Sequence, residues 1–306
     1  MIKCPRCPRT ELDLDSLNQE VSLDNFKSGF PTNFLNQIEK FLFCGDIGDP
    51  IYATEFLDIV TYIKTNSNTQ LYIVTNGSYK KSQWWQQLGQ LLDHNDMVTF
   101  SVDGWDNASN NQYRINSNFD SILAGISSLR LSSKCSIVWS MIYFSFNQNK
   151  VNDIKQLATS LGCNRFQTVK SSKFDNQYQQ QNVDLLKPNI KFVAASSMYE
   201  TAIEMLNQDS YQDTPQLTPV HLHPWAKCLR WEKELFINVD GYVSPCPWFN
   251  SGYLKNNFFE QHKTQLNIKT RGLKEILEDP VWDDLYTKFE SNPLQICQLK
   301  CKGSYV

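Results

Sequence analysis

Between Ile38 and Val169, short apolar runs alternate with longer segments in which apolar residues recur at helical spacing. Short apolar runs that are each followed by an amphipathic helix are typical of βα units around a parallel sheet. We therefore predict an α/β fold with five parallel strands, because a helix-length crossover joins each strand to the next. The predicted strands lie in residues 38–45, 71–77, 97–104, 135–144 and 165–171.

The crossover segments carry local signals of helix ends. Asn118 precedes a run of apolar residues at helical spacing, which predicts an N-cap. Gly162 closes the last helical pattern and is expected at the C′ position, where the left-handed conformation favours glycine. The predicted helices cover residues 52–65, 82–94, 118–131 and 150–162.

Polar or glycine-bearing residues follow the carboxyl ends of the predicted strands. In parallel α/β proteins the ligand site lies at this edge of the sheet. We therefore expect the functional residues in these segments, which are 45–50, 75–77, 101–104, Asn147 and 170–173.

The rhythm of βα units ends near residue 172. An Asn- and Gln-rich stretch follows to about residue 220, with one predicted helix at 193–208. Alternating apolar residues around Asp240 and Gly241 then predict a β-hairpin with a type I′ turn, and residues 272–290 predict two helices separated by Pro280. We predict a barrel-like domain at 1–175, a linker with helical character at 176–225 and a small module at 226–306.

Composition and charge narrow the class of protein. The 41% hydrophobic content favours an ordered core, and no apolar run approaches the roughly 20 residues that span a bilayer. With 29 basic against 32 acidic residues, neither a nucleic-acid partner nor a membrane is expected. The start of the chain has no apolar signal region, which predicts a cytoplasmic protein with reduced thiols.

Six of the nine cysteines are spaced as metal ligands. Four thiolates around one point, as the C-terminal set named below would provide, suit either tetrahedral zinc or an iron–sulfur cluster, and the spacing alone does not choose between these two metal sites. The candidates are an N-terminal pair, Cys4 and Cys7, and a C-terminal set, Cys228, Cys246, Cys297 and Cys301. The remaining three, Cys44, Cys135 and Cys163, are scattered, and we expect Cys135 and Cys163 to be structural.

The order of several short motifs resembles the radical S-adenosylmethionine (radical SAM) superfamily. "KCPRCPR" is followed in turn by "GDP", "TNG" and "SVDG" at the ends of successive strands. The C-terminal Cys-x12-Gly-x4-Cys with a later cysteine pair resembles the SPASM or twitch type of auxiliary-cluster module. The resemblance implies a partial (β/α)6 TIM-like barrel, here without its first strand, followed by a small auxiliary-cluster module made of a β-hairpin and helix.

The resemblance also implies the cofactors and the reaction. In this superfamily a Cys-x3-Cys-x2-Cys loop binds three irons of a 4Fe-4S cluster, and the fourth iron takes the amino and carboxylate groups of S-adenosylmethionine (AdoMet). A one-electron donor such as flavodoxin or ferredoxin is implied, because reductive cleavage of AdoMet gives the 5′-deoxyadenosyl radical that modifies a peptide or small-molecule substrate. The C-terminal cysteines would hold a second, auxiliary 4Fe-4S cluster.

Individual residues acquire expected roles from the same resemblance. The segment from Gly48 through Asp49 to Pro50 matches the part of the superfamily that binds the AdoMet amino group, with Asp in place of the usual Glu. Ser101 and Asp103 match its Ser-x-Asp-Gly segment, in which the serine lies near the ribose or carboxylate. Arg114 is expected to pair with the AdoMet carboxylate, and Asn76 and Asn147 are weaker candidates for polar contacts within the barrel.

One departure from the superfamily concerns the cluster loop. The first cysteine of Cys-x3-Cys-x2-Cys belongs four residues before Cys4, where this sequence has no residue. Either the start is clipped, which is the simpler explanation, or the protein is a degenerate member, and the chain as given is expected to assemble this cluster poorly.

Two other functions are compatible with the cysteine pattern. A non-catalytic protein could use the cysteines to bind zinc or an iron–sulfur cluster as a scaffold or binding module. A thiol–disulfide exchanger at Cys4 and Cys7 would need a strand directly before the pair, and only three residues precede it.

Overall fold

The computed structural model describes residues 2–5, 7, 19–45, 48–170, 186, 234–247 and 261–291. The chain divides into two compact units, residues 1–194 and 195–306. Three predicted metal ligands, Cys228, Cys297 and Cys301, and the predicted helix at 193–208 lie outside the described residues. In the described parts of the chain, no helix is both long and apolar enough to cross a membrane.

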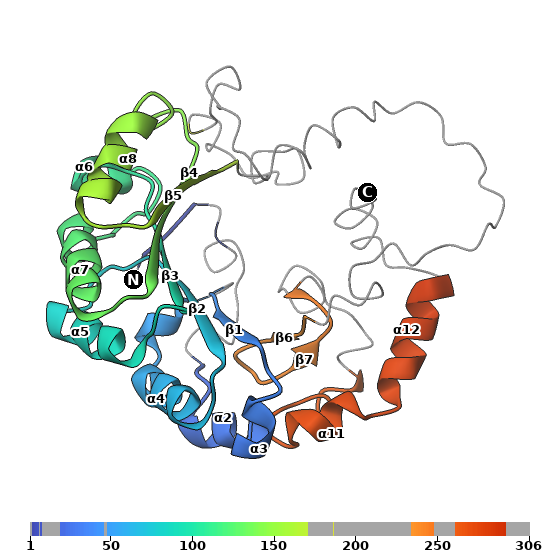
Figure 1. The fold of residues 1–306 in the computed structure, drawn as a ribbon. Helices are drawn as coiled ribbons and strands as arrows, with labels where there is room; N and C mark the ends of the chain where they lie inside the picture. Colours follow the sequence, from blue (N-terminus) through green and yellow to red (C-terminus); the bar gives the residue numbers. More distant parts are fainter. Residues whose placement is uncertain are drawn as a thin grey trace, which may run out of the picture. The chain divides into compact units, whose positions relative to one another are not determined.

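Unit 1 is built around a five-stranded parallel sheet, which confirms the predicted fold class (Figure 1). Its strands follow one another in chain order, and each is hydrogen-bonded to the next in parallel register. They are β1 (Lys40–Phe43), β2 (Gln70–Thr75), β3 (Met97–Ser101), β4 (Ser136–Ile142) and β5 (Arg165–Val169).

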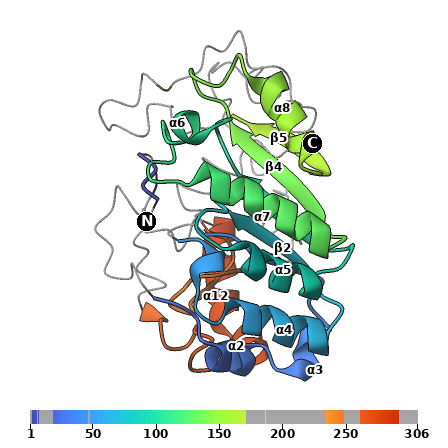
Figure 2. The same cartoon turned by 90° about the vertical axis from the view of Figure 1, so that its left-hand side faces the viewer.

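Helices cover one face of this curved sheet, as expected for part of a barrel wall (Figures 1 and 2). Asn118 accepts a hydrogen bond from the Ser121 N–H, and Gly162 has φ of +82°, which confirms both predicted cap residues. The helices between strands are η1 (Pro50–Tyr52), α4 (Phe56–Asn66), α5 (Ser82–Leu91), α6 (Asn107–Asn110), α7 (Phe119–Ser132) and α8 (Val151–Ser160), and α2 (Leu23–Gly29) and α3 (Thr32–Leu35) precede the sheet.

Side chains that alternate along the strands place the core between the sheet and the helices. Every second residue of the central strands is fully buried on one face, namely Leu71, Ile73, Val98, Phe100, Ile137 and Trp139. On the other face, Leu42 of β1 is 58% exposed and Ser101 of β3 is half-buried. Leu42 at the edge of this face and Ser101 at the strand ends are therefore accessible, whereas Thr99 and Val138 in its middle are buried.

Two glycines allow α5 and α7 to pack closely. A Cβ atom on Gly125 of α7 would lie 2.5 Å from the indole nitrogen of Trp85, which is fully buried in α5. A Cβ atom on Gly89 of α5 would lie 2.1 Å from Ser132 Oγ. Any larger residue at these positions would push the helices apart.

Unit 2 contains the predicted hairpin, but with a different turn. β6 (Phe236–Ile237) pairs antiparallel with β7 (Val243–Ser244). A type I′ turn at Asp240 and Gly241 requires positive φ at both residues, and only Gly241 has it, at +90°. The predicted turn type is therefore wrong. The Gly241 N–H donates to the Asn238 carbonyl, and the Asn238 side chain accepts from the Tyr242 N–H, so Asn238 closes a longer loop.

The two helices predicted around Pro280 are also present. They are α11 (Leu273–Leu277) and α12 (Val281–Ser291), and the break lies at Asp279 and Pro280. Asp279 accepts a hydrogen bond from the Val281 N–H and forms an ion pair with Arg271 at 2.6 Å. This pairing fixes the start of α12.

Candidate functional site

The loop after β1 is closed by a glycine and begins η1 with a carboxylate. A Cβ atom on Gly45 would lie 1.6 Å from the carbonyl oxygen of Gly48, so only glycine permits this closure. Asp49 caps η1 by accepting the Ile51 N–H, and Pro50 is the first residue of that helix. Of the predicted segment Gly48 to Pro50, Asp49 is thus the residue that organises the loop.

Asp49 also joins the ends of β1 and β2. Its Oδ2 accepts hydrogen bonds from the Thr75 hydroxyl at 3.0 Å, from the Asn76 N–H at 2.6 Å and from the Asn76 side-chain amide. Burial raises the pKa of Asp49 to about 6, although these hydrogen bonds and the Arg114 charge act to lower it. Asp49 and Asn76, predicted separately from two strand ends, therefore form one cluster.

Tyr52 extends this cluster and was not predicted as a site residue. Its hydroxyl donates to the Ser78 carbonyl at 2.7 Å and lies 3.2 Å from Asn76 Oδ1. Burial and the negative charge of Asp49 raise the pKa of Tyr52. No motif marks Tyr52 in the sequence, because its partner is 24 to 26 residues away in the next loop.

Asp103, after β3, is fully buried and held on all sides. Its N–H donates to Asn110 Oδ1 at 2.9 Å, and its carbonyl accepts from Asn147 Nδ2 at 2.8 Å. Its Oδ1 accepts the Ile142 N–H at 2.8 Å, and its Oδ2 lies 2.7 Å from Arg114 Nε. Burial raises the pKa of Asp103, and the Arg114 charge and the Ile142 N–H oppose this rise.

Of the two asparagines that contact Asp103, one was predicted from the sequence and the other was not. Asn147 was a weak candidate for a polar contact, but it is fully buried and its side chain also contacts Phe144 and Ile142. Asn110 was not predicted. The only local signal near it is the capping box of Asp106 and Ser109, which begins the short helix α6 that carries Asn110.

Arg114 links Asp103 to the N-terminal cysteine loop. The Lys3 N–H donates to the Ile115 carbonyl at 2.9 Å in an antiparallel bridge, which places Cys4 beside Arg114. Burial acts to lower the pKa of Arg114, but the negative charges of Asp103 and Cys4 outweigh it and the pKa is raised. The buried guanidinium therefore lies next to the predicted cluster ligand.

Cys4 and Cys7 are close together in the same loop. The Cys7 N–H donates to the Cys4 carbonyl at 3.0 Å, which closes a tight turn between the two thiols. Together they supply two thiolates beside a buried cation, a donor set that fits a soft metal or an iron–sulfur cluster. Within the described ranges, no group of three or more His, Cys, Asp or Glu side chains could hold a metal ion.

The other candidate residues lie apart from these contacts. Ser101 is half-buried at the end of β3, on the face of the sheet away from the helices, in register with Ser140 of β4. Cys246 is half-buried after β7, where its carbonyl accepts a hydrogen bond from the Ser244 hydroxyl. Burial raises the pKa of Cys163 to about 11 and also raises that of Cys135, which is typical of structural thiols.

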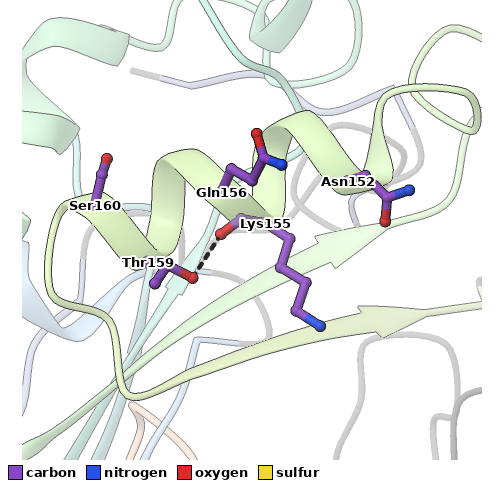
Figure 3. Close-up of a pocket in the computed structure, with 5 residues that line it drawn as sticks. All are labelled: Asn152, Lys155, Gln156, Thr159 and Ser160. Atoms are coloured by element: carbon purple, nitrogen blue, oxygen red, sulfur yellow. Dashed lines mark hydrogen bonds between the residues drawn. The ribbon is translucent and has the colours of Figure 1, made fainter.

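A surface depression lies along α8 (Figure 3). All five of its lining residues, Asn152, Lys155, Gln156, Thr159 and Ser160, belong to α8. The Thr159 hydroxyl donates to the Lys155 carbonyl within the same helix. No predicted site residue borders this depression, so it is not the candidate site.

Comparison with known proteins identifies the C-terminal part of the chain. Residues 228–302 match the family model of SPASM, an iron–sulfur cluster-binding domain. This range includes all four C-terminal cysteines that the spacing predicted as metal ligands. A search of curated proteins finds no match.

The whole chain resembles solved structures at low identity. The structure of anSMEcpe with bound AdoMet and the Cp18Cys peptide aligns with a TM-score of 0.58 and 17% identity, over 98% of this chain and 82% of that one. SuiB from Streptococcus suis bound to S-adenosylmethionine aligns with a TM-score of 0.57 and 12% identity, over 93% of this chain and 64% of SuiB. At these identities the similarity concerns the fold. The chain therefore has the radical SAM fold and carries a SPASM iron–sulfur cluster-binding domain at residues 228–302.

Proposed function

We propose that this protein is a radical SAM enzyme that modifies a peptide substrate. The observation that carries the proposal is the position of Arg114, a buried cation held by Asp103 beside Cys4 at the carboxyl ends of the strands. Support comes from the similar structures, since anSMEcpe was solved with AdoMet and a peptide, and SuiB with AdoMet and with its precursor peptide SuiA.

Each group of residues has a proposed part in holding the cofactors. Cys4 and Cys7 would provide two of the thiolates of the AdoMet-binding 4Fe-4S cluster, and the four SPASM cysteines would hold the auxiliary cluster. The chemistry that a bound cluster and AdoMet supply is reductive cleavage of the AdoMet carbon–sulfur bond, which starts hydrogen abstraction from the substrate. A one-electron donor such as flavodoxin or ferredoxin completes the proposed set of partners.

Arg114 is proposed to bind the AdoMet carboxylate. Its Nε faces Asp103, and its terminal nitrogens make no hydrogen bond to any residue that the structure describes. The outer edge of the guanidinium therefore keeps two parallel donors, which match the two oxygens of a carboxylate. Ser101, at the end of β3, would provide a hydroxyl for the ribose or the carboxylate.

The loop around Asp49 is proposed to bind the AdoMet amino group. Because Oδ2 of Asp49 already accepts three hydrogen bonds from Thr75 and Asn76, its main part would be to hold the loop in place. The backbone carbonyls of Gly48 and its neighbours would then accept from the ammonium group. Asn76 would contribute indirectly, because its N–H and its side-chain amide donate to Asp49 and hold that carboxylate in place.

The proposal is tested on a chain extended upstream by a segment that carries the cysteine expected four residues before Cys4. The extended chain is reconstituted anaerobically with iron and sulfide and then incubated with AdoMet and dithionite. We expect charge-transfer absorbance and release of 5′-deoxyadenosine, measured by liquid chromatography. Cys4→Ala and Cys7→Ala should abolish the release, whereas Cys163→Ala, which removes a structural thiol after α8, should retain it. Tetrahedral zinc without charge-transfer absorbance would favour the non-catalytic alternative instead.

A further inference from the structure

Asp103 is enclosed by its contacts, and its Oδ2, which has no well-aligned hydrogen bond, faces Arg114 Nε in the ion pair. Its side chain is 0% exposed, and both of its backbone polar groups are paired with asparagine side chains. Oδ1 accepts the Ile142 N–H, and Oδ2 lies 2.7 Å from Arg114 Nε. A buried carboxylate with these partners can act on a ligand only through Arg114.

The pairing with Asp103 determines which edge of Arg114 is available. A guanidinium presents one edge that includes Nε and another made of its two terminal nitrogens. Asp103 occupies the Nε edge, and the Arg114 side chain is 11% exposed. An arginine side chain has many rotamers in solution, so this buried pair fixes one of them in advance of binding.

We infer that Asp103 is a positioning residue that turns the terminal nitrogens of Arg114 toward the carboxylate of AdoMet, and is not itself a cofactor ligand. The inference rests on the proposed function and changes the direct role that the sequence motif implied for Asp103. Asn110 and Asn147 serve the same purpose one step further away, because they hold the Asp103 backbone.

A pair of ligands separates positioning from general structural support. AdoMet and decarboxylated AdoMet differ only in the carboxylate, so the ratio of their dissociation constants reports carboxylate recognition. The measurement is equilibrium binding to the full chain, extended upstream by the cysteine expected four residues before Cys4 and reconstituted anaerobically. We expect the wild-type protein to bind AdoMet about tenfold or more tightly than the decarboxylated ligand, as for a charge-assisted bidentate contact.

Asp103→Asn removes the charge that orients Arg114. We expect it to lower the preference for AdoMet about fivefold or more, with less than about twofold change in affinity for the decarboxylated ligand. Asp106→Asn is the matched control, because Asp106 lies in the same loop without contacting Arg114, and asparagine is an equally good N-cap. The control should keep the wild-type ratio.

Two further variants keep the inference testable if Asp103→Asn fails to fold. Asp103→Glu keeps both charges but moves the carboxylate by one methylene, and it should also lower the ratio. Asp103→Asn combined with Arg114→Met leaves no unpaired buried charge and should abolish the preference entirely.

The outcomes distinguish the two proposals. If the wild-type protein binds neither ligand, the proposed function fails and the inference fails with it. If it prefers AdoMet but the Asp103 variants weaken both ligands equally, or change neither, Asp103 is not a positioning residue for carboxylate recognition.

Discussion

The pKa of Asp49 predicts a pH-dependent loss of stability that can be isolated with one substitution. Burial raises the pKa of this carboxyl from 3.8 to about 6 in the folded protein. A shift of about two pH units corresponds to roughly 3 kcal/mol between the protonated and ionised forms. The folded protein therefore binds the Asp49 proton more tightly than the unfolded chain does.

The sign of the effect follows from this difference in proton binding. The stabilising contribution is fully present below pH 3.8, and it is lost as the pH rises to about 6 and beyond. Asp49→Asn removes the titration while keeping an oxygen that can accept from Thr75 and Asn76. Relative to wild type, the variant should gain roughly 2–2.5 kcal/mol in free energy of unfolding between pH 4 and pH 7, because a small part of the effect is already present at pH 4.

The assay is urea denaturation at several pH values between 4 and 7, followed by tryptophan fluorescence. The quantity compared is the difference in free energy of unfolding between variant and wild type, in which other titrations cancel. Asp58→Asn, at an exposed position in the first turn of α4, is the control and should show a constant difference. A constant difference for Asp49→Asn as well would refute the argument that desolvation of the Asp49 carboxylate destabilises the folded protein at neutral pH.

The remaining predictions concern two tight backbone positions and the auxiliary cluster. Gly45→Ala should lower the melting temperature and weaken AdoMet binding about tenfold or more, because its Cβ would collide with the Gly48 carbonyl. Gly48→Ala is the control and should leave the melting temperature unchanged, because a Cβ there meets nothing within 4 Å. Gly125→Ala should lower the free energy of unfolding by about 1–2 kcal/mol in urea denaturation, since overpacking against Trp85 exceeds the gain in helix propensity. An unchanged stability would mean that the two helices can separate without cost. Cys246→Ala should reduce the iron content by one cluster, measured by iron and sulfide analysis, and a complete loss of iron would contradict two independent sites.

The sheet and its crossover helices could be predicted because each signal is local. Apolar runs predict the strands. Asn118 begins a helix by accepting a hydrogen bond from a backbone N–H three residues later, and Gly162 ends a helix through its own positive φ. The SPASM module was predicted from the resemblance of its cysteine pattern to that of a known family, and the match at 228–302 confirms it. The hairpin turn was wrong because a side chain two residues earlier, Asn238, decides the loop length.

The pairing within the candidate site could not be predicted, because it depends on contacts between loops. The sequence indicated Asp103 and Arg114 as two separate ligands, and nothing in an 11-residue separation shows that one is buried behind the other. Tyr52 has no motif, since its partner Ser78 is brought close only by the parallel order of the strands. Asn110 bonds within its own loop, to the N–H groups of Asp103 and Gly104, through a turn that no motif marks. Local sequence patterns therefore predict helices and strands, whereas the functional role of a site residue depends on its burial and on its hydrogen bonds to other loops.

The measurement that tests the account most directly is electron paramagnetic resonance, with and without AdoMet, of the reduced, reconstituted protein that has been extended upstream by the first cysteine of the cluster loop. The account predicts that AdoMet changes the spectrum of a reduced cluster, that Cys4→Ala and Cys7→Ala remove this change, and that Cys246→Ala retains it. A wild-type spectrum that AdoMet leaves unchanged would contradict the claim that the Cys4 and Cys7 loop, with Arg114 beside it, forms the AdoMet site.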